Sequence, residues 1–358
     1  MGGTTKALKL ATLLTGSEAV FATAMAALGS TGPTGLTDMW VNKTFNPHKV
    51  KKGLRTDEGS INATRGMTQR TVVTREGSLP ISVDMTIELW TWALALMMGN
   101  DTVTGTSPEY THTIKHPAIC ALSPPSTTFL QGIVCAGLTE GYKSLKGCVV
   151  DSIGLTVSAQ KQVEMAISIL TDGSETTEAS LTFPTVFEDT FIQGGQAGWS
   201  FVEGSGVDLQ LGPPGSLVDI SGAGTNQLKS LKYDLNAGFE VVKRTSNGIT
   251  VPQFRYGKNM PKLKFSAVVA ADKSDTIYGY ADGETVVEAI ITFTAPSISS
   301  NARTSVVTLQ NMYVQATESG DEDEPELTLD FEPIDLVSNQ GPAIYVNKTG
   351  LAGYLVGQ

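Results

Sequence analysis

The sequence predicts a mainly β protein with antiparallel strands and one α-helix at about residues 84–98. Three observations support this fold class. Two segments, 149–170 and 307–331, each contain two runs of alternating apolar and polar residues joined by a polar turn, which is typical of an antiparallel hairpin with one buried face. One apolar segment has helical spacing instead. The order of elements then recurs along the chain, which predicts two pseudo-repeated copies of the β unit.

The two hairpins differ in their turns. In the first, the alternation of residues 153–157 resumes at residues 163–169 after about five polar residues. In the second, the acidic turn 318–326 follows residues 307–314, and Asn311 interrupts the alternation, so we expect a β-bulge there. The acidic run 321–324 lacks the ligand spacing and the glycine of a calcium-binding loop, and we interpret it as a solvated hairpin tip.

Residues 84–98 are expected to form a helix of about four turns. Asp84 is a suitable N-cap, Glu88 lies in the first turn, where the helix dipole favours an acid, and Gly99 suits the position after the last turn. The segment is apolar around most of its circumference, which predicts that it is buried in the core or between subunits.

The repeat defines the predicted domain organisation. A first β domain spans residues 35–170 and a second spans 227–335, each with a strand, a loop, a strand, a helical segment, a strand and a hairpin. Pro80 precedes Gly99 by 19 residues, and Pro261 precedes Gly279 by 18. The helical segment of the second copy, at 268–280, is much weaker. A mixed β protein can also produce such an order by coincidence, and that alternative stays open.

Three segments lie outside the two copies. They are an N-terminal segment (1–34), a connection rich in Gly, Ser and Pro (171–226) with one or two short strands such as 181–186, and a C-terminal tail (336–358) that is able to cross to a neighbouring subunit.

Composition excludes several function classes. The 25 basic and 36 acidic residues give a net charge of −11, which disfavours a non-specific grip on nucleic acid. With 41% hydrophobic and 17% charged residues, the chain has enough apolar material for a core. No window approaches the roughly 20 apolar residues of a membrane-spanning helix, so no membrane insertion is expected.

No catalytic, cofactor-binding or metal-binding constellation is predicted. The three cysteines form no CxxC pair and are expected to be reduced and buried. His48, His112 and His116 are the only histidines, and we interpret them as surface or loop residues. No enzymatic activity and no cofactor are therefore expected.

The N-terminus leaves an alternative function open. Basic and apolar residues in the first 28 positions resemble a secretory signal, although Glu18 interrupts the apolar run. If the chain is exported, it is an extracellular bacterial surface or adhesin-type β protein.

The order of elements resembles that of the tail tube proteins of long-tailed bacteriophages. The resemblance covers most of residues 35–335 as a pattern. One block contains Arg55–Gly59 and Arg65–Gly66 and leads through Arg75–Gly77 into a strand and the apolar helix. The other block is the pair of hairpins that begin at Val150–Val157 and Thr308–Val314.

The resemblance implies an antiparallel β-sandwich or half-barrel flanked by the α-helix at about residues 84–98. It also implies a structural virion protein that self-assembles into rings, which stack into the tube through which DNA is ejected. It implies three chains per ring if the tube domain is duplicated and six otherwise. Implied partners are other copies, the tape measure, tail terminator and distal tail proteins, and DNA in transient, non-specific passage. An acidic lumen would repel the phosphates. The expected location is the phage tail, after synthesis in the host bacterial cytoplasm.

The loop of the first copy is expected to contact a partner. It spans 35 residues from Phe45 to Pro80, against 22 from Phe239 to Pro261 in the second copy, and it has few apolar residues. Such a loop is expected to be disordered alone and ordered against the adjacent ring or subunit, although an ordinary solvated loop is the alternative. The candidate contact residues are Lys49, Lys51, Lys52, Arg55, Asp57, Glu58, Arg65 and Arg70.

Overall fold

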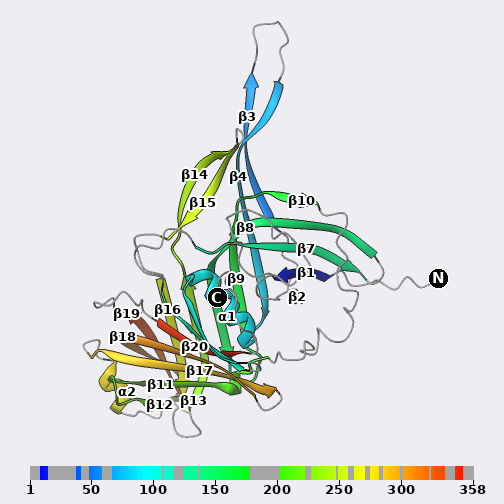
Figure 1. Ribbon diagram of the computed structural model, residues 1–358. Coiled ribbons are helices and arrows are strands. Elements are labelled where there is room, and N and C mark those ends of the chain that lie inside the picture. The colour runs from blue at the N-terminus through cyan, green and yellow to red at the C-terminus, as the bar shows by residue number, and fades with distance from the viewer. Residues whose placement is uncertain are drawn as a thin grey trace, which may run out of the picture.

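The protein is described from a computed structural model, which confirms a mainly β fold (Figure 1). The described residues are 9–14, 38–41, 48–58, 67–106, 109–116, 124–135, 138–177, 201–221, 227–246, 249–256, 262–270, 275–281, 285–298, 301–321, 324–334 and 343–349.

Seven strands form a continuous antiparallel layer in the order β4–β9–β8–β13–β16–β19–β18, which we call the seven-strand sheet. It contains both predicted hairpins, β8–β9 and β18–β19. The two halves of the chain join inside this layer, where β8 pairs with β13 from Ser152 opposite Asn236 to Ser158 opposite Ser230. The strands are β4 (Met67–Asp84), β8 (Leu138–Ser158), β9 (Glu164–Thr171), β13 (Gln227–Asn236), β16 (Lys262–Ala270), β18 (Asn301–Asp321) and β19 (Glu324–Pro333).

The predicted bulge is confirmed. Asn311 has a positive φ of 52°, and the register between β17 and β18 shifts between the pairs Val287–Met312 and Ala289–Leu309. The bulge separates two parts of the long strand β18. Residues 312–321 lie in the seven-strand sheet, and residues 303–309 lie in a second sheet.

The second sheet has the order β12–β11–β17–β18–β20–β6–β5. Its further strands are β5 (Asp101–Thr106), β6 (Glu109–Ile114), β11 (Val207–Gly212), β12 (Val218–Asp219), β17 (Val287–Ile298) and β20 (Ala343–Thr349). Residues 343–349 of the expected C-terminal tail form strand β20, which pairs with β6 on one side and β18 on the other.

A smaller layer has the order β2–β1–β7–β8–β10 and uses the first part of β8. It is built from β1 (Lys9–Leu14), β2 (Asp38–Val41), β7 (Thr127–Cys135) and β10 (Glu175–Thr177). The N-terminal segment and the expected connection therefore both supply strands. The predicted strand at 181–186 lies outside the described residues.

The predicted helix is present as α1 (Ile87–Met98), but it is shorter than expected. Thr86 is its N-cap instead of Asp84, and its Oγ1 accepts a hydrogen bond from the backbone N of Leu89 at 3.2 Å. Asp84 is instead the last residue of β4 and pairs with Glu164 of β9. Gly99 ends the helix in the left-handed conformation, as predicted. Among the described residues of the second half, α2 (Asp275–Tyr280) is the one helix, and residues 268–270 of the predicted helical segment belong to β16 instead.

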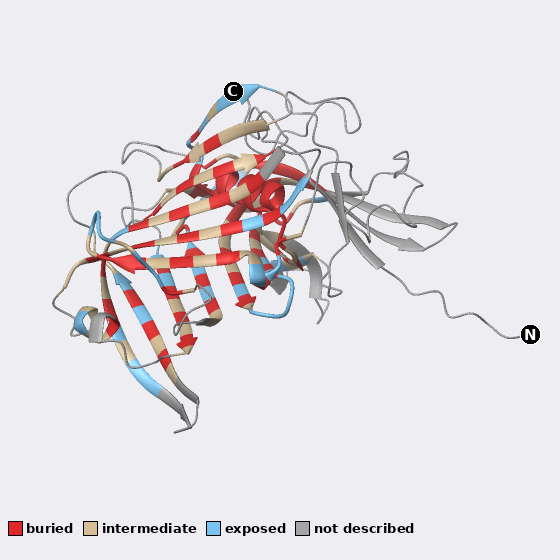
Figure 2. Ribbon diagram, turned by 90° about the horizontal axis from the view of Figure 1, so that it is seen from below, coloured by how far each residue is buried: buried red, intermediate tan, exposed pale blue. Residues whose placement is uncertain are grey.

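Helix α1 lies in the core between the two large sheets, with all twelve residues buried (Figure 2). The Trp90 ring makes edge contacts with Tyr233 of the seven-strand sheet and Tyr345 of the second sheet, and its Nε1 donates to Ser305 Oγ at 3.0 Å. The helix thus belongs to the first half of the chain but packs against strands of the second, and the halves share one core.

Candidate assembly surfaces

The predicted long loop is a β-hairpin, so the expectation of a disordered loop is wrong for the described residues. Strand β3 (Lys49–Glu58) pairs with the first part of β4 from Lys49 opposite Ser78 to Glu58 opposite Met67. We call this hairpin the long arm; it projects away from the sheets (Figure 1). The β-branched run Thr71–Thr74 favours a strand, and Lys51 lies opposite Glu76, which compensates part of the charge.

Seven of the eight candidate contact positions lie on the long arm. Lys49, Lys51 and Lys52 are exposed on β3. Positions 55, 57 and 58 follow on the same strand, and position 70 lies on β4. Arg65 lies outside the described residues. The structure thus brings the predicted residues together on one element.

A second hairpin, which the sequence analysis missed, projects beside the first (Figure 1). We call this pairing of β14 (Glu240–Ser246) with β15 (Ile249–Arg255) the short arm. The sequence signal was an Asn-Gly pair at 247–248 between two β-branched runs, which favours a tight hairpin turn. A parallel bridge between Thr250 and Thr74 connects the arms, and Lys243 Nζ lies 3.3 Å from Glu76 Oε1.

A groove of about 460 Å³ lies between the bases of the arms. Its apolar lining comes from both arms and from the end of β9, and the exposed side chains of Lys49, Lys51 and Lys243 surround it. Val241, at 49% exposure, is one of the most exposed large hydrophobic residues among those that the structure describes. The apolar lining consists of Val50, Leu170, Val241, Pro252 and Phe254.

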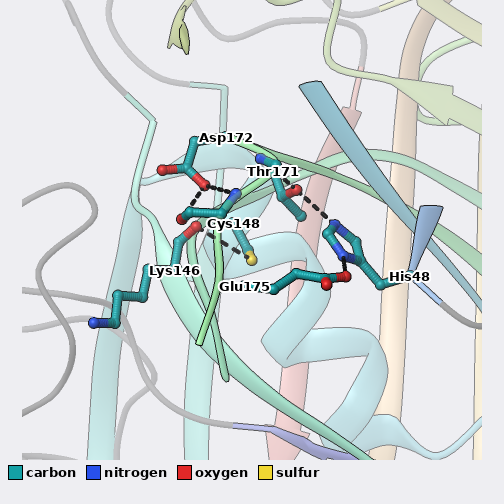
Figure 3. A network of polar contacts seen from close by, with 8 residues as sticks. His48, Lys146, Cys148, Thr171, Asp172 and Glu175 are labelled. Carbon is teal, nitrogen blue, oxygen red and sulfur yellow. Dashed lines mark hydrogen bonds and ion pairs between the residues drawn. The ribbon is translucent and has the colours of Figure 1, made fainter. Parts of the chain in front are cut away.

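The base of the long arm is fixed to the body by His48 (Figure 3). Its Nδ1 lies 2.7 Å from Glu175 Oε1, and its Nε2 lies 2.8 Å from Thr171 Oγ1. The His48 side chain is only 1% exposed. The interpretation of the histidines as surface or loop residues is wrong for His112, which is fully buried in β6 with its Nδ1 2.8 Å from Asp101 Oδ2. His48 is a loop residue, as expected, because it precedes β3. The sequence could not reveal these contacts, because the carboxylates that contact the two histidines, Glu175 for His48 and Asp101 for His112, are brought close only by the fold.

Two glycines make the close packing at this base possible. A Cβ on Gly77 would lie 2.1 Å from Thr171 Oγ1 and 2.5 Å from His48 Nε2. Gly173 has a φ of +74°, and a Cβ there would lie 2.9 Å from backbone atoms of Glu76. The loop after β9 therefore crosses directly over β4, which holds the long arm against the body.

The base of the short arm is fixed to helix α1. The hydroxyl of Tyr256 donates to the carbonyl oxygen of Met97 at 3.1 Å, and the Tyr256 ring packs edge-on against Phe239. Burial raises the pKa of Tyr256 above its usual range, so the hydroxyl stays protonated and can donate.

The outward face of the seven-strand sheet carries mainly small and polar side chains. Alternation along each strand places apolar residues in the core and leaves Ser82, Gly154, Ala166 and Ser168 on a shallow trough of about 720 Å³. Asp84 and Glu164 lie directly opposite each other, a like-charge pair that costs stability. Among the described residues, the charges of this face are Asp84, Glu164, Asp234, Glu326, Asp330, Glu332, Lys229, Lys232, Lys262 and Lys264.

The seven-strand sheet ends in two edges. Within the part of the chain that the structure describes, residues 79–84 of β4 pair only with β9, and residues 313–321 of β18 pair only with β19. The edges lie on the first and last strands of the layer. Open edges readily pair with strands of another chain.

A family model described as phage tail tube protein matches residues 9–333. The chain belongs to the phage tail tube protein family. A search of curated proteins finds no match. The family assignment confirms the resemblance seen in the sequence and identifies a structural component of the phage tail, in preference to the surface-protein alternative.

The described residues contain neither a group of three or more metal-ligating side chains placed to hold an ion nor a helix suited to crossing a membrane. The candidate assembly surfaces of this tail tube family member are the two arms, the polar sheet face and the open edges.

Proposed function

We propose that this tail tube protein self-assembles into closed rings, which stack into a conduit for DNA leaving the virion. The two open edges of the seven-strand sheet carry this proposal. A ring that joins the β18 edge of one copy to the β4 side of the next removes both edges at once, and closed symmetry then repeats the contact around the ring.

The junction between the two halves supports three chains per ring. The first half pairs its strands in the order β4–β9–β8–β7, and the second half pairs its strands in the order β16–β19–β18–β17. The helices occupy matching places along the chain: α1 lies between β4 and β7 in the first half, and α2 lies between β16 and β17 in the second. If the halves are duplicated tube domains, neighbouring chains should pair in the same way as β8 pairs with β13 within one chain. Three chains then supply six tube domains to each ring.

The polar face of the seven-strand sheet is the proposed lumen wall. Its six carboxylates and four lysines among the described residues give it a net charge of −2 per chain. A surface of this charge repels phosphates, and small side chains leave few projections on which a polymer can catch. DNA would then pass without adhering.

The long arm is the proposed contact with an adjacent ring, through the predicted residues at positions 49, 51, 52, 55, 57, 58, 65 and 70. We assign the tape measure, tail terminator and distal tail proteins as further partners, the virion tail as the location and the host cytoplasm as the site of synthesis. No enzymatic role is proposed.

Sedimentation, native mass spectrometry and negative-stain microscopy test the proposal together. Concentrated protein should form rings of three chains and tubes of uniform width with a central channel. A chain that stays monomeric at every concentration overturns ring closure. Rings of six chains would keep the conduit and refute the duplication.

A further inference from the structure

We propose that two buried polar side chains, Tyr345 and Asn347, fix the register of strand β20 in the second sheet. Strand β20 lies between β6, which belongs to the first half of the chain, and β18, which belongs to the second. Its register therefore determines where the β5–β6 hairpin lies relative to the second half. The inference concerns single chains and does not depend on ring formation.

The alternation of buried residues in β20 is compatible with two shifted registers. Every second side chain of the strand, from Ala343 to Thr349, is buried. A shift by one residue would turn these side chains outward, whereas a shift by two keeps every second residue in the core. The ion pair of Lys348 with Glu109 lies on the outward face, and exposed pairs of this kind contribute little. Another feature must therefore select the observed register.

The hydroxyl of Tyr345 is the first selecting feature. It lies 2.5 Å from the hydroxyl of Tyr233 on β13, and both side chains are fully buried. Burial raises the pKa of both tyrosines, so both hydroxyls stay protonated and one donates to the other. A shift by two residues moves Tyr345 by about 6.6 Å along the strand, which separates the two hydroxyls.

Asn347 is the second selecting feature. It lies opposite Ser305 of β18 on one side and His112 of β6 on the other, and we call these three buried polar residues the polar row. The amide of Asn347 makes no hydrogen bond to any residue that the structure describes, although its side chain is fully buried. A buried amide of this kind lowers stability, so its role in β20 is to specify the register rather than to stabilise the strand.

Both shifted registers bring polar and apolar side chains together in the core. A shift in one direction places Asn347 opposite Val307 and Ile114, two apolar residues that are fully buried. A shift in the other direction places the Tyr345 ring in the polar row. Because buried polar groups without partners are costly, the observed register is favoured over both alternatives.

Engineered cysteine pairs on the outward face can report the register. Thr304→Cys and Lys348→Cys lie opposite each other in the observed register. Val306→Cys and Lys348→Cys come opposite each other only after a shift by two residues. Thr304→Cys and Val346→Cys do so only after the shift in the other direction. Diagonal neighbours have Cα atoms about 7–8 Å apart, which is too far for a disulfide without movement of the backbone.

The test compares a variant without the two polar groups with a control that keeps them. The variant carries Tyr345→Phe and Asn347→Val, and the control carries Ala343→Gly, which removes a buried methyl group from the same strand. Each chain contains one cysteine pair and has its three native cysteines replaced by alanine. Dilute protein is refolded from urea under reducing conditions and then oxidised. Mass spectrometry of peptides measures the disulfides, and circular dichroism checks the fold.

With the native β20 sequence and in the control, only the pair at 304 and 348 should form a disulfide. In the variant, the shifted pairs should form roughly tenfold more often, because a shift no longer leaves buried polar groups unpaired. Shifted disulfides that stay at the background level, or that rise equally in the control, would overturn the proposal. A variant that fails to fold would overturn it too, because the two groups would then be needed for stability.

Discussion

Replacing Glu88 by alanine should strongly destabilise the protein. Glu88 lies in the first turn of α1, and its Oε1 is 2.9 Å from Nε of Arg303 on β18. The two side chains are only 1% and 3% exposed. Without Glu88, the guanidinium keeps its charge in the core and loses the carboxylate that balances it. Breaking a buried pair in this way costs about 3–5 kcal/mol.

A double variant separates two effects on stability: leaving one buried charge without its partner, and removing both charges together. Replacing both residues by methionine removes both charges and fills a similar volume. Exchanges of this kind are often neutral or even stabilising, so Glu88→Met with Arg303→Met should recover most of the loss. The exposed ion pair of Glu76 with Lys243, whose side chains are 43% and 60% exposed, is the matched control. Glu76→Ala should cost about 0–1 kcal/mol.

Urea unfolding followed by circular dichroism measures these differences, with each variant kept dilute so that association does not add to its stability. The reasoning is refuted if Glu88→Ala shifts the free energy of unfolding by less than about 1 kcal/mol, or if the double variant is as unstable as the single one. Either result would mean that the pair does not couple the helix of the first half to the sheet of the second.

Three further predictions concern the arms and the core. Deleting residues 50–70 removes most of the long arm and should leave folded protein that forms no tubes; unimpaired tubes in negative stain would contradict the contact assignment. Gly77→Ala places a Cβ 2.1 Å from Thr171 Oγ1 and should lower the melting temperature and reduce tube yield, whereas Gly215→Ala, which has open space but a positive φ, should cost only the backbone strain; equal losses from both changes would contradict the close packing. Burial raises the pKa of Asp151, so the folded state binds its proton more readily than the unfolded chain, and the stability contributed by this group is lost as the pH rises. Asp151→Asn should therefore raise the melting temperature at pH 7 more than at pH 3, and calorimetry showing the reverse would be inconsistent with a partly buried carboxyl.

Local patterns in the sequence were sufficient to predict the hairpins, the bulge and the end of the helix. Strict alternation in β8, β9 and β19 reports which face is buried, and Asn311 breaks that alternation at the bulge. The prediction that Gly99 ends the helix is confirmed, because glycine adopts the left-handed conformation without steric cost. The N-cap was wrong by two residues because Asp84 has a competing role in the ladder with β9, which capping preferences do not include.

The remaining features depend on contacts between distant segments. Ala343, Tyr345, Asn347 and Thr349 alternate with exposed or half-buried positions, but β20 becomes a strand only because β6 and β18 lie on either side of it. The long arm was taken for a loop because its charges hide the strand pattern. Cross-strand pairing compensates only part of this charge, because Lys51 lies opposite Glu76 but Lys52 lies opposite Arg75.

The shared core has a consequence for how the arms function. Helix α1 is buried between sheets to which both halves contribute, and its C-terminal carbonyl at Met97 accepts the hydrogen bond from Tyr256 at the base of the short arm. The long arm is continuous with β4, which leads into the same helix through Thr86. Both arms are therefore fixed to one helix at opposite ends. In the proposed tube, a force applied to the arms by a neighbouring ring would be transmitted to the core. Such a tube would derive its stiffness from the same contacts that hold the two halves of each chain together.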